Sequence, residues 1–241
     1  AQINTTVGDF AGNTDKILRA YRELVAAGAD FVITPELAVC GYPPMDLVFR
    51  SGFIAAAERH VNALAAETGA VPLIVGTVEP NPAPHGRPCH NSAVVLQNGR
   101  RLATAHKSLL PTYDVFDEGR YFEPASRLTI AEMAGRRTGI TICEDLWTAE
   151  YLPRDFYGRS PLDELAASGI DLLLNLSASP FEAGKPVKRR LMLSAIARRL
   201  KVPLVYANLV GGNDQLVFDG HSLAFDAEGH LAAELPGFRE V

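Results

Sequence analysis

The sequence predicts an α/β fold, because apolar strands alternate along it with helical segments. Strands such as residues 171–176 ("DLLLNL") are too apolar to face solvent on either side, so helices are expected to cover both faces. Turn signals at Asn98-Gly99 and Ala134-Gly135 join other strands as hairpins, which makes the sheets mixed rather than purely parallel. The 241 residues, 47% of them hydrophobic, suffice for one large domain with a substantial core. We expect residues 1–241 to form that single domain.

The expected elements follow in chain order from the periodicity of the apolar residues. Helices are predicted at residues 14–27, 53–68, 161–168 and 187–201. Strands are predicted at residues 30–37 ("DFVITPEL"), 71–79 ("VPLIVGTVE"), 170–178 and 202–210, and hairpins at residues 91–107 and 127–143. Residues 216–235 are predicted to form a strand pair with a turn near Ala227 to Gly229.

Charge and hydropathy argue against several kinds of partner. The formal net charge is -5 and the pI is near 5.7, whereas proteins that bind nucleic acid or anionic membranes usually carry a basic patch. No apolar run approaches the ~20 residues that span a bilayer. The opening "AQINTTVGDF" is not a secretory leader, and because it lacks Met we expect a few residues to precede it. We expect a cytoplasmic protein that binds neither nucleic acid nor membrane.

The cysteines indicate neither a disulfide framework nor a metal site. There are three, Cys40, Cys89 and Cys143, an odd number with wide spacing, which favours a reducing compartment. No C-x-x-C pair occurs. His85, Cys89 and His90 lie close together in "PHGRPCHNS", but this Pro-rich stretch is typical of a solvent-facing connection. No metal is expected.

Three predicted strand ends carry chemically capable side chains. Glu36 follows Pro35 in "VITPEL", Lys107 ends "LATAHK" and Cys143 ends "ITIC". Functional side chains in α/β folds lie where strands end and loops begin. An acid, a cation and a thiol would form a plausible catalytic group if the three strands are neighbours in the sheet.

The chemistry of these groups fits amide hydrolysis through an acyl-enzyme. The acids that follow Cys143 favour the neutral thiol, although the thiolate is the reactive form. We therefore expect Lys107 to outweigh those acids and to lower the thiol pKa. Lys107 and the backbone N–H of Glu144 would stabilise the oxyanion of a tetrahedral intermediate. Glu36 would accept the thiol proton, pass it to the leaving amine and later activate water.

The same residues allow plainer interpretations. A cysteine at a buried strand end often only packs, and Glu36 and Lys107 can be solvated charges. A cysteine–histidine hydrolase that uses His106 or His221 as its base is a further alternative, and its pH profile would follow a histidine. Spacing alone does not decide between these interpretations.

Four segments resemble the nitrilase superfamily and, more narrowly, the glutaminase (amidotransferase) domain of glutamine-dependent NAD synthetases. They are "PELAVCGYPPMDL", "HKSLLPTYDVFDEGRYF", "CEDLW" and "NLSASPFEAGK", and the resemblance covers nearly the whole chain. It implies a four-layer α-β-β-α sandwich, a catalytic triad of Glu36, Lys107 and Cys143, and assembly as a homo-oligomer.

The resemblance also implies a set of glutamine-binding residues. Glu118 matches a glutamate that helps to hold the lysine and the substrate, and its carboxylate would contact the substrate ammonium. The other matched positions are Tyr42, Tyr113 and Phe116 around the pocket, and Ser179 and Lys185 at the amino-acid end of glutamine. A free amino acid brings a carboxylate and an ammonium, so a site with Lys185 and a carboxylate suits it.

The function that the resemblance implies is hydrolysis of L-glutamine, with the ammonia consumed by an ATP-dependent synthetase domain in cis or in trans. We expect that domain to be absent here, because "VGGNDQ" (residues 210–215) lacks the serines of the pyrophosphatase loop S-G-G-x-D-S and precedes a strand. No cofactor is expected for the amidase reaction, and ATP and Mg belong to the synthetase domain. The alternatives are a free-standing amidase or carbamoylase for another small amide, and a non-enzymatic assembly module.

Overall fold

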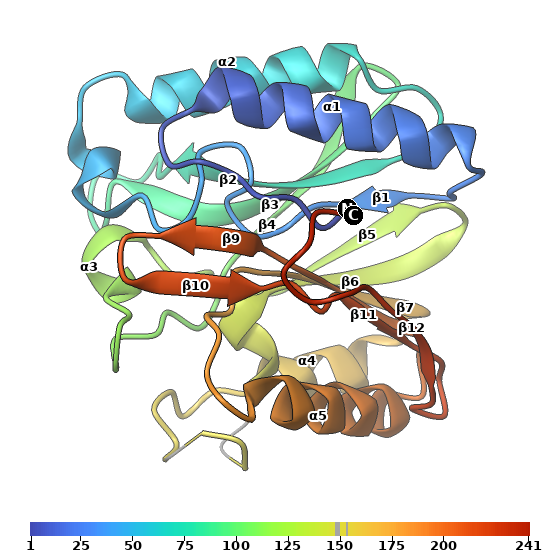
Figure 1. Ribbon diagram of the computed structural model, residues 1–241. Coiled ribbons are helices and arrows are strands. Elements are labelled where there is room, and N and C mark those ends of the chain that lie inside the picture. The colour runs from blue at the N-terminus through green and yellow to red at the C-terminus, as the bar shows by residue number, and fades with distance from the viewer. Residues whose placement is uncertain (148–149, 153) are drawn as a thin grey trace.

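Four layers stack in the order helix, sheet, sheet, helix, as Figure 1 shows for the computed structural model, which describes residues 1–147, 150–152 and 154–241. The first layer holds α1 (Phe10–Ala26) and α2 (Phe53–Ala66). The last layer holds α4 (Pro161–Ser168) and α5 (Lys185–Leu200). The sandwich and its mixed sheets confirm the predicted fold class.

Two sheets form the inner layers. The strands of the four-stranded sheet are β1 (Val32–Ile33), β2 (Leu73–Pro80), β3 (Cys89–Gln97) and β4 (Arg100–His106), in that order. The six-stranded sheet has the order β12-β11-β8-β7-β6-β5, and its strands are β5 (Thr129–Met133), β6 (Arg136–Ile142), β7 (Leu172–Ser177), β8 (Leu204–Asn208), β11 (Leu223–Phe225) and β12 (Leu231–Glu234). Strands β6, β7 and β8 run parallel and the outer pairs are antiparallel.

Smaller elements lie at one end of the sandwich. The hairpin of β9 (Val210–Asn213) and β10 (Leu216–Asp219) pairs outside both sheets. Three short helices accompany it: η1 (Met45–Phe49), α3 (Glu118–Tyr121) and η2 (Cys143–Leu146).

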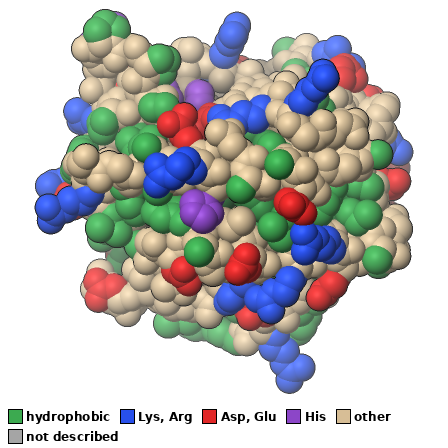
Figure 2. All heavy atoms as spheres, turned by 90° about the horizontal axis from the view of Figure 1, so that it is seen from above, with side chains coloured by type: hydrophobic (Ala, Val, Ile, Leu, Met, Phe, Trp, Pro, Cys, Tyr) green, Lys and Arg blue, Asp and Glu red, His purple; other side chains and the backbone are tan. Residues whose placement is uncertain are grey.

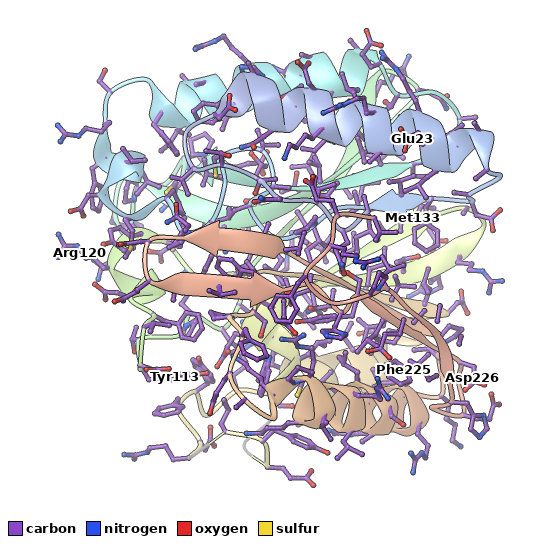
Figure 3. The ribbon with its side chains drawn as sticks, viewed as in Figure 1. Glu23, Tyr113, Arg120, Met133, Phe225 and Asp226 are labelled. Atoms are coloured by element: carbon purple, nitrogen blue, oxygen red, sulfur yellow. The ribbon has the colours of Figure 1, made fainter. Side chains whose placement is uncertain are left out.

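Apolar side chains fill the three interfaces between the layers. Representative residues are Ile17, Leu64 and Val75; Ile74, Val95 and Ile140; and Leu173, Met192 and Ile196. Figure 3 shows side chains filling the space between the ribbons, with Met133 and Tyr113 toward opposite ends of the molecule. The strands are therefore buried on both faces, which explains why they are so apolar.

Local signals set the helix ends. Asp9 caps α1 by accepting a hydrogen bond from the Gly12 N–H at 2.9 Å, so this helix begins earlier than the predicted residue 14. Ser160 caps α4, Pro161 occupies its first turn, and Gly169 ends it with φ +64°. The predicted bounds of α4, residues 161–168, are confirmed.

The predicted strand at residues 30–37 is mostly wrong. Only Val32 and Ile33 pair with β2, because Pro35 has no N–H and the Glu36 N–H points instead to the Ser177 carbonyl of the other sheet at 3.4 Å. Gly76 makes room for this departure, since a Cβ there would lie 2.3 Å from the Pro35 carbonyl oxygen. Glu36 is thereby carried from one sheet toward the other.

The predicted strand pair at residues 216–235 is two separate pairs. Residues 216–219 form β10 and pair with β9, whereas β11 pairs with β12 around the predicted turn. Gly220 and His221, with φ of +68° and +51°, interrupt the strand between them.

Charges are spread over the face that α1 and α2 form, where Figure 2 shows acidic and basic side chains interspersed with apolar ones. No helix in the described ranges is long and apolar enough to cross a membrane.

One buried carboxylate, Asp145, ties the two sheets together. Its Oδ2 accepts a hydrogen bond from the Ile142 N–H at 2.9 Å. Its Oδ1 accepts from the Ser108 N–H at 2.9 Å and the Leu109 N–H at 2.8 Å. Ile142 ends β6 of the six-stranded sheet, whereas the other two donors follow β4 of the four-stranded sheet. Asp145 therefore fixes the end of β6 relative to the end of β4.

Replacing Asp145 with asparagine is expected to destabilise the fold. The amide puts an N–H2 group opposite a backbone N–H, and an unsatisfied buried donor costs about 1–3 kcal/mol in the free energy of unfolding, which urea denaturation measures. Asp171→Asn is the matched control, because the exposed Asp171 carboxylate accepts from only the Arg137 N–H among the described groups. Equal losses in both variants would show that Asp145 is not a special tie.

Candidate active site

Glu36, Lys107 and Cys143 come together at one end of the sandwich, but their strands are not neighbours in one sheet. Lys107 follows β4 at one edge of the four-stranded sheet, and Glu36 follows β1 at its opposite edge. Cys143 follows β6 in the other sheet. The condition that the three strands are neighbours in one sheet is therefore not met. Packing of the two sheets against each other gathers these residues.

Lys107 lies between two carboxylates and is fully buried. Its Nζ is 2.7 Å from Glu36 Oε1 and 2.8 Å from Glu118 Oε1. Burial alone would lower the pKa of Lys107, but the attraction of Glu118 and Glu36 outweighs it and the pKa is raised well above its ordinary value. The site therefore contains a fixed ammonium.

The orientation of Glu36 is set by donors from three segments. Besides the ammonium of Lys107, the Asn91 side-chain amide donates to Oε1 at 2.7 Å and the Ala178 N–H donates to Oε2 at 2.9 Å. Asn91 lies in β3 and Ala178 follows β7, so both sheets hold this one carboxylate. The remaining lone pair on Oε2 is available to accept a proton.

Glu118 contacts Lys107 and Tyr42 contacts Glu118, and neither of them lines the pocket that opens over Cys143. The Tyr42 hydroxyl donates to Glu118 Oε1 at 2.8 Å, and both side chains are buried. Burial raises the pKa of Glu118 to about 7, with Lys107 opposing the shift. The resemblance assigns both residues to glutamine binding, and the structure places them where they hold the lysine.

Cys143 begins η2 with φ +41°, a left-handed conformation that is rare for a side-chain-bearing residue and concentrates at functional sites. Burial raises the pKa of its thiol, and the nearby Glu36 raises it further. Lys107 lowers the pKa but does not outweigh these effects. The expectation that Lys107 produces a low thiol pKa is therefore wrong, and the resting thiol is neutral.

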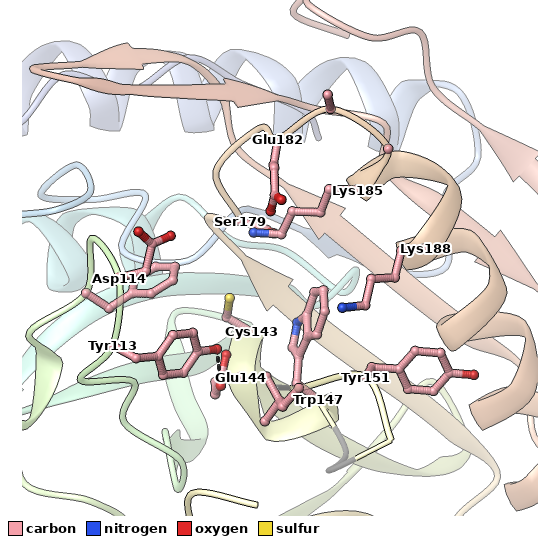
Figure 4. Close-up of a pocket in the computed structure, with 14 residues that line it drawn as sticks. Tyr113, Asp114, Cys143, Glu144, Trp147, Tyr151, Ser179, Glu182, Lys185 and Lys188 are labelled. Atoms are coloured by element: carbon pink, nitrogen blue, oxygen red, sulfur yellow. Dashed lines mark hydrogen bonds between the residues drawn. The ribbon is translucent and has the colours of Figure 1, made fainter. Parts of the chain in front are cut away.

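A pocket of about 370 Å³ opens over Cys143. Its lining residues are Tyr113, Asp114, Phe116, Cys143, Glu144, Trp147, Tyr151, Leu152, Ser179, Glu182, Ala183, Gly184, Lys185 and Lys188. Figure 4 shows Cys143 near the middle, with Tyr113 on one side of it and Trp147 on the other. Four of the predicted substrate-binding residues line this pocket: Tyr113, Phe116, Ser179 and Lys185.

Sequence reasoning missed the side-chain role of Glu144 and the contributions of Trp147 and Lys188. Glu144 Oε1 accepts from the Tyr113 hydroxyl at 2.6 Å, drawn as a dashed line in Figure 4, and from the Tyr157 hydroxyl at 2.8 Å. Burial raises the pKa of Glu144, and the two hydroxyls oppose the shift. The available signal is the position of Glu144 beside Cys143, from which the sequence predicts a role only for the backbone N–H.

Two ammonium groups flank Trp147 at the opposite wall. Lys185 Nζ and Lys188 Nζ each lie 5.6 Å from the centre of the indole ring. Burial lowers the pKa of Lys185. The pocket thus presents two ammonium groups on the α5 wall and the Glu144 carboxylate beside Tyr113. Two further carboxylates, Asp114 and Glu182, also belong to its lining.

The other candidate groups lie outside this pocket. Cys89 is buried near the Tyr121 carbonyl. The His90 ring stacks on the His106 ring with 4.0 Å between their centres, and the His90 Nδ1 is bonded to the Glu123 carbonyl. Among the described residues, His85, Cys89 and His90 do not form a group of possible metal ligands. His221 bonds to a glutamate of β12 rather than lining the pocket. Within the described ranges, one group of possible metal ligands occurs, the exposed cluster Asp226, Glu228 and His230 at the β11–β12 turn.

Sequence relatives of this chain include glutamine-dependent NAD synthetases. The enzyme of Synechocystis sp. is 42% identical over 100% of this chain and 44% of its own length, and that of Thermotoga maritima is 37% identical over 96% and 38%. This chain therefore spans less than half the length of these relatives.

Solved structures agree with the sequence relatives. Glutamine-dependent NAD+ synthetase from Acinetobacter baumannii, in complex with ADP, superposes with a TM-score of 0.89 at 34% identity, over 100% of this chain and 43% of that one. An amidase from Nesterenkonia sp. superposes with a TM-score of 0.80 at 26% identity, over 99% and 84%. A mutant of that amidase, 25% identical to this chain, carries acrylamide added at its active site cysteine.

The family comparison covers every residue. The family model described as carbon-nitrogen hydrolase matches residues 1–241. The four layers, the buried lysine between two glutamates and the cysteine in a pocket are the features of this chain within that match. The chain belongs to the carbon-nitrogen hydrolase family.

Proposed function

We propose that this chain hydrolyses the side-chain amide of L-glutamine to glutamate and ammonia through a thioester on Cys143. The observation that carries the proposal is a pocket over a buried thiol, whose lining contains two ammonium groups on the α5 wall and carboxylates that include Glu144. A free amino acid has the complementary pair of charges. The glutamine-dependent relatives support the same substrate.

The proposed reaction begins when Cys143 Sγ attacks the amide carbonyl carbon while the thiol proton moves to the Glu36 carboxylate. When the C–N bond breaks, Glu36 returns the proton to nitrogen, ammonia leaves and a thioester remains. Glu36 then accepts a proton from water, and the water oxygen attacks the thioester carbonyl. The C–S bond breaks, sulfur regains a proton and glutamate departs.

Lys107 serves this reaction through its charge. Its ammonium stabilises the developing oxyanion, aided by the backbone N–H of Glu144. Glu144 is the second residue of η2, and N–H groups in the first turn of a helix lack partners within that helix. Glu118 and Tyr42 act by holding Lys107 in place.

The amino-acid end of glutamine would bind across the pocket. Lys185 and Ser179 would receive the substrate carboxylate, and Tyr113 and Phe116 would cover its methylene chain. The Glu144 carboxylate would receive the ammonium, since it lines the pocket whereas Glu118 is engaged with Lys107.

The amidase step would need no cofactor, because the chain supplies the nucleophile, the base and the cation. A synthetase domain with ATP and Mg would consume the ammonia, in keeping with the names and lengths of the relatives. Cytoplasmic location and homo-oligomeric assembly stay predictions. A second candidate, an amidase for another small amide, is favoured by the match to 84% of the Nesterenkonia amidase.

The substrate is tested by intact-protein mass spectrometry after incubation with 6-diazo-5-oxo-L-norleucine, an electrophilic glutamine analogue. We expect one adduct, on Cys143, that excess L-glutamine prevents and that Cys143→Ala abolishes, together with release of ammonia from L-glutamine. Adduct formation that glutamine does not slow, without ammonia release, would indicate an amidase for another substrate. A folded protein with no adduct would contradict the proposal.

Glu36→Gln is expected to lower kcat for glutamine by about 10²–10⁴-fold, because the amide is not a general base. Ammonia release measures this loss. Glu67→Gln is the matched control, since Glu67 pairs with Arg22 at the surface. A kcat for Glu36→Gln close to that of the control would rule out Glu36 as the base.

The raised thiol pKa predicts how the resting protein reacts with iodoacetamide. The rate of Cys143 alkylation should rise about tenfold per pH unit from pH 6 to the ordinary thiol value of 9.0, because the thiolate fraction grows throughout that range. Mass spectrometry follows the rate, and Cys143→Ala gives the background from Cys40 and Cys89, whose pKa values burial also raises. A rate that becomes constant between pH 6 and 8 would show a resting thiolate instead.

A further inference from the structure

Arg189 is a fully buried cation on α5, one helical turn beyond Lys185. Its Nη1 lies 3.1 Å from Asp219 Oδ2 and its Nη2 lies 3.1 Å from Asp219 Oδ1, so the guanidinium grips the carboxylate with two parallel bonds. The Asp219 side chain is also fully buried. The guanidinium carbon lies 5.6 Å from the centre of the Tyr206 ring.

Stability alone does not account for this pair. Removing two charges from water is costly, and well-packed apolar residues of similar volume usually stabilise a core as well as a buried ion pair does. The Nε of Arg189 also has no hydrogen-bond partner within the described part of the chain, which adds to the cost. A positional role is the remaining use of such a pair.

The pair joins the segments that form one wall of the pocket. Arg189 Nη2 donates to Ser179 Oγ at 3.4 Å, and Ser179 lines the pocket. Asp219 ends β10, and the loop between β7 and α5 pairs with that strand through the Phe181 N–H and the Val217 carbonyl at 2.7 Å. The ion pair therefore fixes α5, the Ser179 loop and β10 relative to one another.

The position of Arg189 on α5 also determines where Lys185 and Lys188 lie. Residues three and four apart lie on the same face of a helix, so Lys185, Lys188 and Arg189 share one face of α5. The two lysines line the pocket, whereas Arg189 is behind its wall. A rotation or shift of α5 would move both ammonium groups relative to Cys143.

We propose that Arg189 is a positioning residue, whose ion pair with Asp219 holds Ser179 and the first turn of α5 at the place where the amino-acid end of the substrate binds. The inference rests on the proposed function and deepens it. Neither partner of the pair lines the pocket, so its loss acts chiefly on recognition of the amino-acid end. Arg189 and the Cys143 thiolate also interact through their charges, and the double variant removes the charges of both partners of the ion pair.

The test compares two electrophiles that need different parts of the site. Iodoacetamide needs only the Cys143 thiol, whereas 6-diazo-5-oxo-L-norleucine also needs the groups that bind a carboxylate and an ammonium. The labelling ratio is the rate at which the glutamine analogue labels Cys143 divided by the rate at which iodoacetamide labels it, both measured by mass spectrometry. It measures how well the pocket binds the amino-acid end, because a general loss of folding would change both rates together.

The main variant is the double substitution Arg189→Met with Asp219→Asn, which removes both charges and leaves neither buried charge unpaired. Arg189→Lys is the second variant, because it keeps the charge but loses the planar fork. Arg190→Met is the matched control on the same helix, since Arg190 pairs with Glu234 at the surface.

We expect the double variant to lower the labelling ratio by about 10- to 100-fold, the scale of a misplaced binding group, and to raise KM for glutamine more than it lowers kcat. Arg189→Lys should give an intermediate ratio, and Arg190→Met the wild-type ratio. A wild-type ratio in either folded variant of Arg189 would overturn the inference. If the wild type reacts with iodoacetamide but not with the glutamine analogue, the proposed function itself fails and the inference falls with it.

Discussion

The buried ammonium of Lys107 is the charge around which the site is organised. An unpaired ammonium is too costly to remove from water, so it requires carboxylates in contact. Glu36 and Glu118 supply them at 2.7 and 2.8 Å, and each comes from a different segment of the chain. The segments after β1 and β4 and the start of α3 must therefore meet for the fold to tolerate this one charge.

Contacts between the two sheets then fix the positions of Lys107 and the carboxylate of Glu36. Asp145 fixes the end of β6 relative to the segment after β4, and Gly76 leaves room for the backbone at Glu36 to leave its own sheet. The Ala178 N–H, beyond β7, donates to Oε2 of Glu36, the oxygen that Lys107 does not contact. Backbone N–H groups of four residues thus act beside the side chains of Lys107 and Asn91 in fixing the carboxylates of Asp145 and Glu36.

The alternation of apolar strands and helices predicted the α/β class, and polar side chains after apolar strands made Glu36, Lys107 and Cys143 candidates. The resemblance to the nitrilase superfamily implied the four-layer sandwich and the triad. The sequence did not predict that Glu36 and Cys143 belong to different sheets, since periodicity identifies a strand without saying which sheet it joins. The predicted lowering of the Cys143 pKa was wrong, because burial raises this pKa most and burial depends on tertiary packing. The Trp147 wall was missed because short loops and helix starts have no periodic pattern.

The neutral thiol of Cys143 also bears on the chemical lifetime of the protein. Peroxides oxidise thiolates far faster than thiols, and the first product, a sulfenic acid, can proceed to irreversible acids. In the proposed reaction the Cys143 sulfur keeps its proton until Glu36 accepts it, so the resting sulfur faces the pocket mostly in its inert form. The burial and the nearby carboxylate that keep the resting thiol neutral would thus also protect it against oxidative damage.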